Sequence, residues 1–133
     1  MIKILLAEDS KFLRIATERA LARAGYTVTT AADGEEALKM AREKPPDLIL
    51  LDMLLPKLSG PDVLKALKLD KTTADIPVVV LSGLSQRNAE RLNHDGAFAF
   101  LEKSALALDQ GSEPLLAALK KIVEQIQQTR IAK

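Results

Sequence analysis

Five residues with reactive side chains stand directly after, or close to, short apolar runs of the sequence. Glu8 and Asp9 follow the first run, Asp52 follows the third, Ser82 follows the fourth, and Lys103 comes shortly after the fifth. Bare carboxylates about 4 Å apart repel each other by roughly 4 kcal/mol per pair at an effective dielectric constant near 20. A site that gathers the three acids therefore needs a cation to offset this repulsion.

A hard divalent ion with oxygen ligands suits such a site. Mg²⁺ accepts few carboxylates, keeps several waters and is completed by phosphate oxygens. Lys103 supplies a mobile positive charge for a phosphate oxygen or for Asp52 itself. Ser82 can donate a hydrogen bond to the same oxygen. The residue types thus indicate a place where Mg²⁺ and a phosphoryl group meet.

The elements that must position these residues alternate between strand and helix. The expected strands are residues 2–7, 27–31, 48–51, 78–81 and 97–101. The third and fourth runs are apolar on both faces, which is typical of central parallel strands covered by helices on each side.

The helices between these strands carry start and stop signals. Four of them are expected to begin near Ser10, Asp33, Pro61 and Ser112. Gly25 ends the first helix, and Pro45-Pro46 ends the second. Residues 86–93 are polar and only weakly periodic, so the helix expected there has the weakest signal.

Five strand–helix units predict an α/β fold with a doubly wound parallel sheet and helices on both faces. Ligands of such folds bind beyond the carboxyl ends of the strands, where the strand order reverses. The reactive residues all fall at that edge. We expect one domain over residues 1–133, with its core over about 2–128.

Composition excludes several classes of function. The 133 residues include 19 basic and 18 acidic side chains, for a net charge of +1, so direct nucleic-acid binding is not expected. No apolar run reaches the roughly 18 residues of a membrane span, so no membrane insertion is expected. The chain has no cysteine and one histidine, which argues against zinc and fits a cytoplasmic location.

The reactive residues also match a known pattern. Taken in order and at these spacings, the set resembles the receiver domain of bacterial response regulators, and it comprises Glu8, Asp9, Asp52, Pro56, Gly60, Ser82, Phe100 and Lys103. The resemblance covers residues 2 to about 128. It implies a flavodoxin-like (βα)5 fold with a five-stranded parallel sheet in the order 2-1-3-4-5.

The resemblance implies a role for each residue of the site. Asp52 would be the phosphoacceptor and, with Glu8, Asp9 and the Leu54 carbonyl, would bind Mg²⁺. Lys103 would be the active-site lysine. Ser82 would be the switch hydroxyl and Phe100 the switch aromatic, although a phenylalanine in a strand is equally well explained as a core residue.

The resemblance also implies how the chain works with other proteins. The phosphoryl donor would be a phosphohistidine on a sensor histidine kinase or a histidine phosphotransfer protein. The signal would be read on the surface formed by the fourth helix, fifth strand and fifth helix, by an unknown output protein. Such a chain is a phosphoacceptor regulator that assists its own phosphorylation and dephosphorylation rather than an enzyme, and we expect a monomer or weak dimer.

Two features depart from the family pattern. Ser104 stands where the family usually has proline after the lysine, and the stretch between Ser82 and Gly96 is about one residue shorter than usual. These departures leave open a degenerate receiver that acts only as an interaction module.

Two further classes remain as alternatives. An aspartate-nucleophile phosphatase usually has a second aspartate two residues after the nucleophile, where this chain has Leu54. A flavodoxin-like binding module needs a phosphate loop after the first strand, where Glu8 and Asp9 would repel phosphate.

Overall fold

A parallel sheet of five strands forms the centre of the fold. The computed structural model describes residues 2–53, 55–82, 96–102 and 113–132. The strands are β1 (Lys3–Ala7), β2 (Thr27–Ala31), β3 (Leu48–Asp52), β4 (Val78–Ser82) and β5 (Ala99–Glu102). They pair in parallel in the order β2-β1-β3-β4-β5. This order confirms the doubly wound α/β fold that the sequence and its resemblance predicted.

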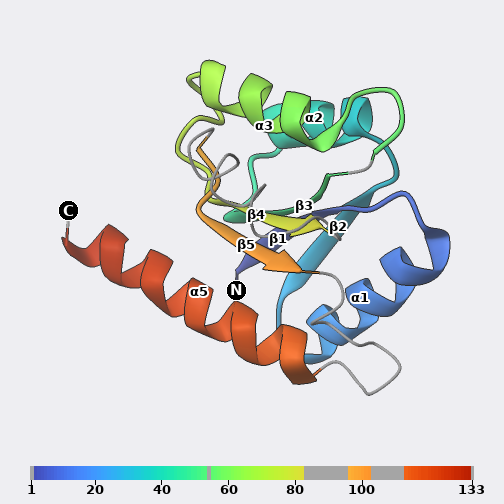
Figure 1. The fold of residues 1–133 in the computed structure, drawn as a ribbon. Coiled ribbons are helices and arrows are strands. Elements are labelled where there is room, and N and C mark those ends of the chain that lie inside the picture. Colours follow the sequence, from blue (N-terminus) through green and yellow to red (C-terminus); the bar gives the residue numbers. More distant parts are fainter. Residues whose placement is uncertain (1, 54, 83–95, 103–112, 133) are drawn as a thin grey trace.

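Helices cover both faces of the sheet (Figure 1). The helices are α1 (Lys11–Arg23), α2 (Gly34–Glu43), α3 (Gly60–Leu69) and α5 (Glu113–Ala132). In Figure 1, α2 and α3 lie on one side of the sheet, and α1 and α5 lie on the other. The helix expected over 86–93 lies outside the described residues. No described helix combines the length and the apolar character that a membrane span requires.

Alternation along the buried strands produces two cores. Because successive side chains of a strand point to opposite faces, each central strand supplies both layers. In β3, Ile49 and Leu51 belong to the cluster under α2 and α3, while Leu48 and Leu50 belong to the cluster under α1 and α5. This accounts for the apolar run over 48–51 that the sequence shows.

Side-chain caps set where the helices begin. Ser10 and Asp33 accept hydrogen bonds from the first turns of α1 and α2, at 3.4 and 2.8 Å, as expected. The third helix begins one residue before the predicted Pro61, because Ser59 is its N-cap and accepts from the N–H of Asp62 at 3.4 Å. Pro61 fits the first turn, where a missing N–H costs no hydrogen bond.

Asp70 ties the end of α3 to α2. Its Oδ1 accepts hydrogen bonds from the N–H and the hydroxyl of Thr72, at 2.9 and 2.8 Å. Its Oδ2 pairs with Nε of Arg42 on α2, at 2.9 Å. The Thr72 N–H and hydroxyl contribute most to lowering the pKa of Asp70, and Arg42 adds to this effect. The pKa of the Asp33 cap is also lowered, chiefly by the N–H of Glu36.

These lowered pKa values predict a loss of stability in acid. A carboxyl whose folded pKa lies below its unfolded value stabilises the fold above about pH 4, and this stabilisation disappears as the pH falls through the folded pKa. Asp70→Asn should therefore lower the melting temperature at neutral pH and have less effect as the pH approaches about 3. Thermal melts of parent and variant across this range test it. A gap between the two melting curves that stays constant down to about pH 3 would contradict the assignment.

Candidate functional site

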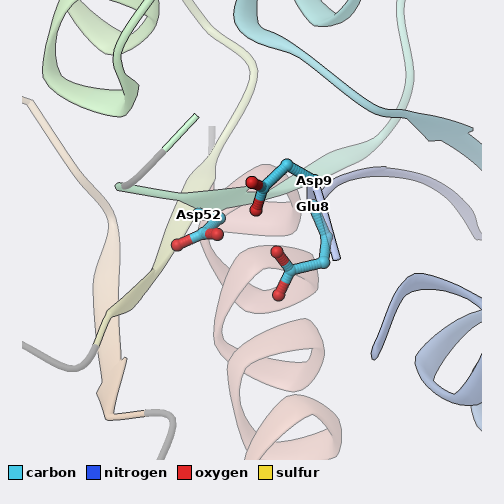
Figure 2. A group of neighbouring side chains, drawn as sticks. All are labelled: Glu8, Asp9 and Asp52. Carbon is cyan, nitrogen blue, oxygen red and sulfur yellow. The ribbon is translucent and has the colours of Figure 1, made fainter. Parts of the chain in front are cut away.

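Three carboxylates lie together at the carboxyl edge of the sheet (Figure 2). Glu8 and Asp9 come directly after β1, and Asp52 is the last residue of β3. One carboxylate oxygen from each residue lies within 4.8 Å of the others. Glu8 and Asp52 are buried, with 3% and 2% of their surfaces exposed, while Asp9 is exposed. The structure thus brings the three predicted acids together, and their individual roles stay predictions.

Strand register explains why Glu8 and Asp52 meet. The last paired residues of β1 and β3 are Ala7 and Leu51, so Glu8 and Asp52 are the next residues on neighbouring strands. The chain leaves β1 towards β2 but leaves β3 towards β4, and the strand order therefore reverses between β1 and β3. This is the position at which doubly wound sheets bind ligands.

The segment that follows β1 is held at both ends. The N–H of Glu8 donates to the carbonyl of Ala31, the last residue of β2, at 3.0 Å. The N–H of Ser10 donates to Oε2 of the Glu8 side chain at 3.3 Å. The Glu8 N–H thus ties the segment to the end of β2, and the Ser10 N–H holds one oxygen of the buried Glu8 carboxylate. The second hydrogen bond fixes the direction of the Glu8 side chain.

The donor set of the cluster fits a hard divalent cation. Its three ligand groups are all carboxylates, and two of them are buried away from the water that would screen their charge. Oxygen-only donors in small number, beside solvent that can complete the coordination, match the preference of Mg²⁺. The residues present therefore fit Mg²⁺ better than a metal that prefers nitrogen or sulfur ligands.

The chain after Asp52 is fixed against β4 and α3. The N–H of Met53 donates to the carbonyl of Leu81 at 3.2 Å, and the N–H of Gly60 donates to the carbonyl of Met53 at 3.0 Å. A Cβ atom at Gly60 would lie 2.5 Å from both the Asp52 carbonyl oxygen and the Met53 Cα. The start of α3 therefore packs directly on the backbone that carries Asp52, and only glycine permits this approach.

The loop between β3 and α3 contains a tight turn at Lys57. Lys57 has a left-handed backbone with φ +67°, and across it the N–H of Leu58 donates to the carbonyl of Pro56 at 2.7 Å. The same carbonyl accepts from the N–H of Gly34 at 3.2 Å. The Lys57 ammonium lies 3.6 Å from the carboxylate of Asp33. The loop is thereby joined to the start of α2.

Relieving the backbone strain at Lys57 should stabilise the protein. A left-handed conformation costs a residue with a Cβ about 1–2 kcal/mol, and glycine avoids this cost. We expect Lys57→Gly to raise the free energy of unfolding by about 0.5–1 kcal/mol after the added chain entropy is counted. Lys57→Ala is the control, because it removes the exposed ammonium but keeps the Cβ. Urea unfolding in which the glycine variant is no more stable than the alanine variant would show that the turn is unstrained.

The other predicted site residues are placed only in part. Ser82 ends β4, where its backbone is paired with Glu102 of β5. Phe100 lies in β5, is partly buried and packs against the core under α2 and α3. Leu54 and Lys103 lie outside the described residues, as does Ser104. The switch roles of Ser82 and Phe100 therefore stay predictions.

Sequence reasoning missed two features, one in the loop that follows β3 and one that contacts the segment after β1. One is the Lys57 turn described above. The other is Arg14 on α1, whose guanidinium contacts the backbone of the acidic segment. The spacing of Arg14 from Ser10 could have indicated this contact. Arg14 stands four positions after the helix cap, so it lies one turn along α1 and its side chain can reach back to the segment before the helix.

The chain matches the family model for the response regulator receiver domain over residues 4–110. It is 41% identical over 110 residues to the gliding motility regulatory protein of Myxococcus xanthus, covering 81% of this chain and 14% of that protein. It is 45% identical over 80 residues to the alkaline phosphatase synthesis transcriptional regulatory protein PhoP of Bacillus subtilis, covering 60% of this chain and 32% of that protein. The chain therefore spans only part of the length of these relatives.

Solved structures of similar chains have the same fold. The chemotaxis response regulator CheY4 of Vibrio cholerae superposes with a TM-score of 0.83 at 31% identity, covering 92% of this chain and 98% of that chain. A response regulator receiver domain protein from Clostridium thermocellum superposes with a TM-score of 0.81 at 29% identity, covering 100% of both chains.

Proposed function

This chain belongs to the response regulator receiver domain family, and we propose that it is a signalling switch in which Asp52 accepts a phosphoryl group in a Mg²⁺-dependent reaction. The observation that carries the proposal is the position of Asp52. It is a buried carboxylate at the end of a central strand, with the carboxylate oxygens of Glu8 and Asp9 within 4.8 Å. A lone capping aspartate would not need two further acids at that distance.

The chemistry that we propose for Asp52 is nucleophilic. A carboxylate oxygen attacks phosphorus while the bond from phosphorus to the donor nitrogen breaks, and the electron pair of that bond leaves with the donor imidazole, which takes up a proton. The transition state of such a transfer is loose, so the protein mainly positions the reacting groups and neutralises the phosphoryl oxygens. The pairing of Asp52 with Leu81 of β4 and the hydrogen bonds of Met53 support this positioning.

Glu8, Asp9, Asp52 and the Leu54 carbonyl would hold the metal ion. When bound, Mg²⁺ supplies positive charge to the phosphoryl oxygens and removes the repulsion among the acids. Lys103 would neutralise a further phosphoryl oxygen, and the hydroxyl of Ser82 would donate a hydrogen bond to the phosphorylated side chain.

We propose that phosphorylation is read as a shift between two packings. The new charge and acceptor oxygens would draw the Ser82 hydroxyl inward, which frees space for Phe100 to turn towards the core. The surface formed by the fourth helix, β5 and α5 would change as a result. The donor would be a sensor histidine kinase or a histidine phosphotransfer protein, and the reader of that surface would be a separate output protein or domain.

Stoichiometry separates this switch from a phosphatase. We expect acetyl phosphate and Mg²⁺ to add at most one phosphoryl group per chain, as seen by intact mass, and excess chelator to prevent it. Free phosphate should then appear no faster than the phosphorylated chain decays. Labelling that is unaffected by chelator would contradict the metal assignment. Rapid continuous turnover of a phosphoester would indicate a phosphatase, and no labelling under any condition would indicate a degenerate receiver.

A further inference from the structure

Arg14 makes an unusual contact with the acidic segment. It is the fourth residue of α1, and its backbone N–H donates to the carbonyl of Ser10 at 2.8 Å within the first turn of the helix. From there its guanidinium reaches back, and Nη1 donates to the carbonyl oxygens of Glu8 at 3.0 Å and of Asp9 at 3.3 Å. One nitrogen therefore binds two consecutive main-chain carbonyls, those of the two acids.

This double contact requires a bend in the chain. In a strand that continued straight, successive side chains would point to opposite faces and successive carbonyls would likewise alternate. Glu8 and Asp9 would then diverge, and only one of them could face Asp52. Both carbonyls instead accept from the same atom of Arg14, and both carboxylates lie with Asp52 in one cluster (Figure 2). The chain thus bends at Glu8 and Asp9, where Arg14 holds both carbonyls, and this bend brings the two adjacent acids to one site.

We propose that Arg14 is a positioning residue for the Glu8–Asp9 pair, holding both carboxylates in the cluster before the cation binds and thereby raising the affinity for Mg²⁺. This inference rests on the proposed function, since it concerns the same metal site. Two other described ties of the segment do not replace the Arg14 contact. The Glu8 N–H bond to Ala31 fixes the strand end, and the Ser10 N–H bond fixes the Glu8 side chain, but neither holds the Asp9 carbonyl.

Charge and positioning predict opposite effects of removing Arg14. A guanidinium beside a cation site repels Mg²⁺, so the loss of its charge alone should tighten binding. Loss of a group that orients metal ligands from outside the coordination sphere typically weakens metal binding about 10–100-fold. The direction of the change in affinity therefore distinguishes a positioning residue from a nearby charge.

The test is a Mg²⁺ titration by calorimetry or NMR, without phosphodonor and well below the melting transition. We expect Arg14→Met, which keeps an unbranched apolar stem but removes the guanidinium, to bind Mg²⁺ about 10-fold more weakly than the parent. Arg14→Lys keeps the charge and can still donate to a carbonyl, so its affinity should lie between the two. Arg19→Met is the matched control, because Arg19 is exposed on the same helix. It should bind Mg²⁺ as well as the parent or slightly better.

Two outcomes overturn different claims. If the parent binds Mg²⁺ and Arg14→Met binds it equally well or more tightly, Arg14 is not a positioning residue although the proposed function stands. If the parent itself does not bind Mg²⁺, the proposed function fails as well. Circular dichroism in chelator checks that each variant is folded at the titration temperature. Should Arg14→Met be unfolded there, Arg14→Gln takes its place, with the same weakening expected and the same result overturning the inference.

Discussion

Asp52→Asn should abolish stable phosphorylation while leaving the fold intact. Asparagine has nearly the same shape but cannot form an acyl phosphate. The substitution also removes one of two buried negative charges in a three-carboxylate cluster. Because unit charges about 4 Å apart repel by roughly 4 kcal/mol at an effective dielectric constant near 20, the variant should melt no lower than the parent in chelator. Intact mass after treatment with acetyl phosphate, together with thermal melts, measures both effects.

Asp75→Asn is the matched control for this substitution. Asp75 is an exposed aspartate just before β4 begins, at the opposite edge of the sheet from Asp52. Its variant should be labelled like the parent. Undiminished labelling of Asp52→Asn would place the phosphoryl group elsewhere. A large fall in its melting temperature in chelator would show that the Asp52 carboxylate stabilises the metal-free fold.

Gly60→Ala should cause a large loss of stability, because the new Cβ has no space. It would lie 2.5 Å from the Asp52 carbonyl oxygen and from the Met53 Cα, and backbone atoms can yield only if β3 and α3 move apart. Overpacking of this kind costs typically 1–3 kcal/mol and occasionally more. We expect a loss at the upper end, about 3 kcal/mol, and slower phosphorylation because the strand end that carries Asp52 must shift.

Gly25→Ala separates this steric effect from the general cost of replacing a glycine. Gly25 follows α1 with φ +101°, and a Cβ there would meet nothing within 4 Å. Its variant should lose only about 1 kcal/mol, from the left-handed backbone alone. Urea unfolding of both variants tests the comparison. Equal losses would show that the approach of α3 to the Asp52 backbone is not tight.

The sequence predicted the sheet well because burial on both faces leaves a clear pattern. The runs over 48–51 and 78–81 are apolar at every position, and they form the central strands β3 and β4. The order of the strands is less accessible, since periodicity does not say which strands are neighbours. That order came from the resemblance, and the pairing of β1 with both β2 and β3 confirms it.

The acids of the site were also predictable, because carboxyl ends of parallel strands share an edge. What the sequence did not predict depends on the path of the backbone. The left-handed turn at Lys57 places a lysine where glycine or asparagine is usual, so no residue type announced it. The contact of Arg14 depends on the direction of two carbonyls, which side-chain patterns do not encode.

Identifying the phosphorylated residue is the sharpest test of whether Asp52 is the phosphoacceptor. After treatment with acetyl phosphate and Mg²⁺, the chain would be reduced with borohydride, which converts an aspartyl phosphate to homoserine, then digested and analysed by mass spectrometry. The proposed function predicts one modified position, Asp52, with no modification in chelator. Modification at Glu8, Asp9 or any other residue in place of Asp52 would contradict it.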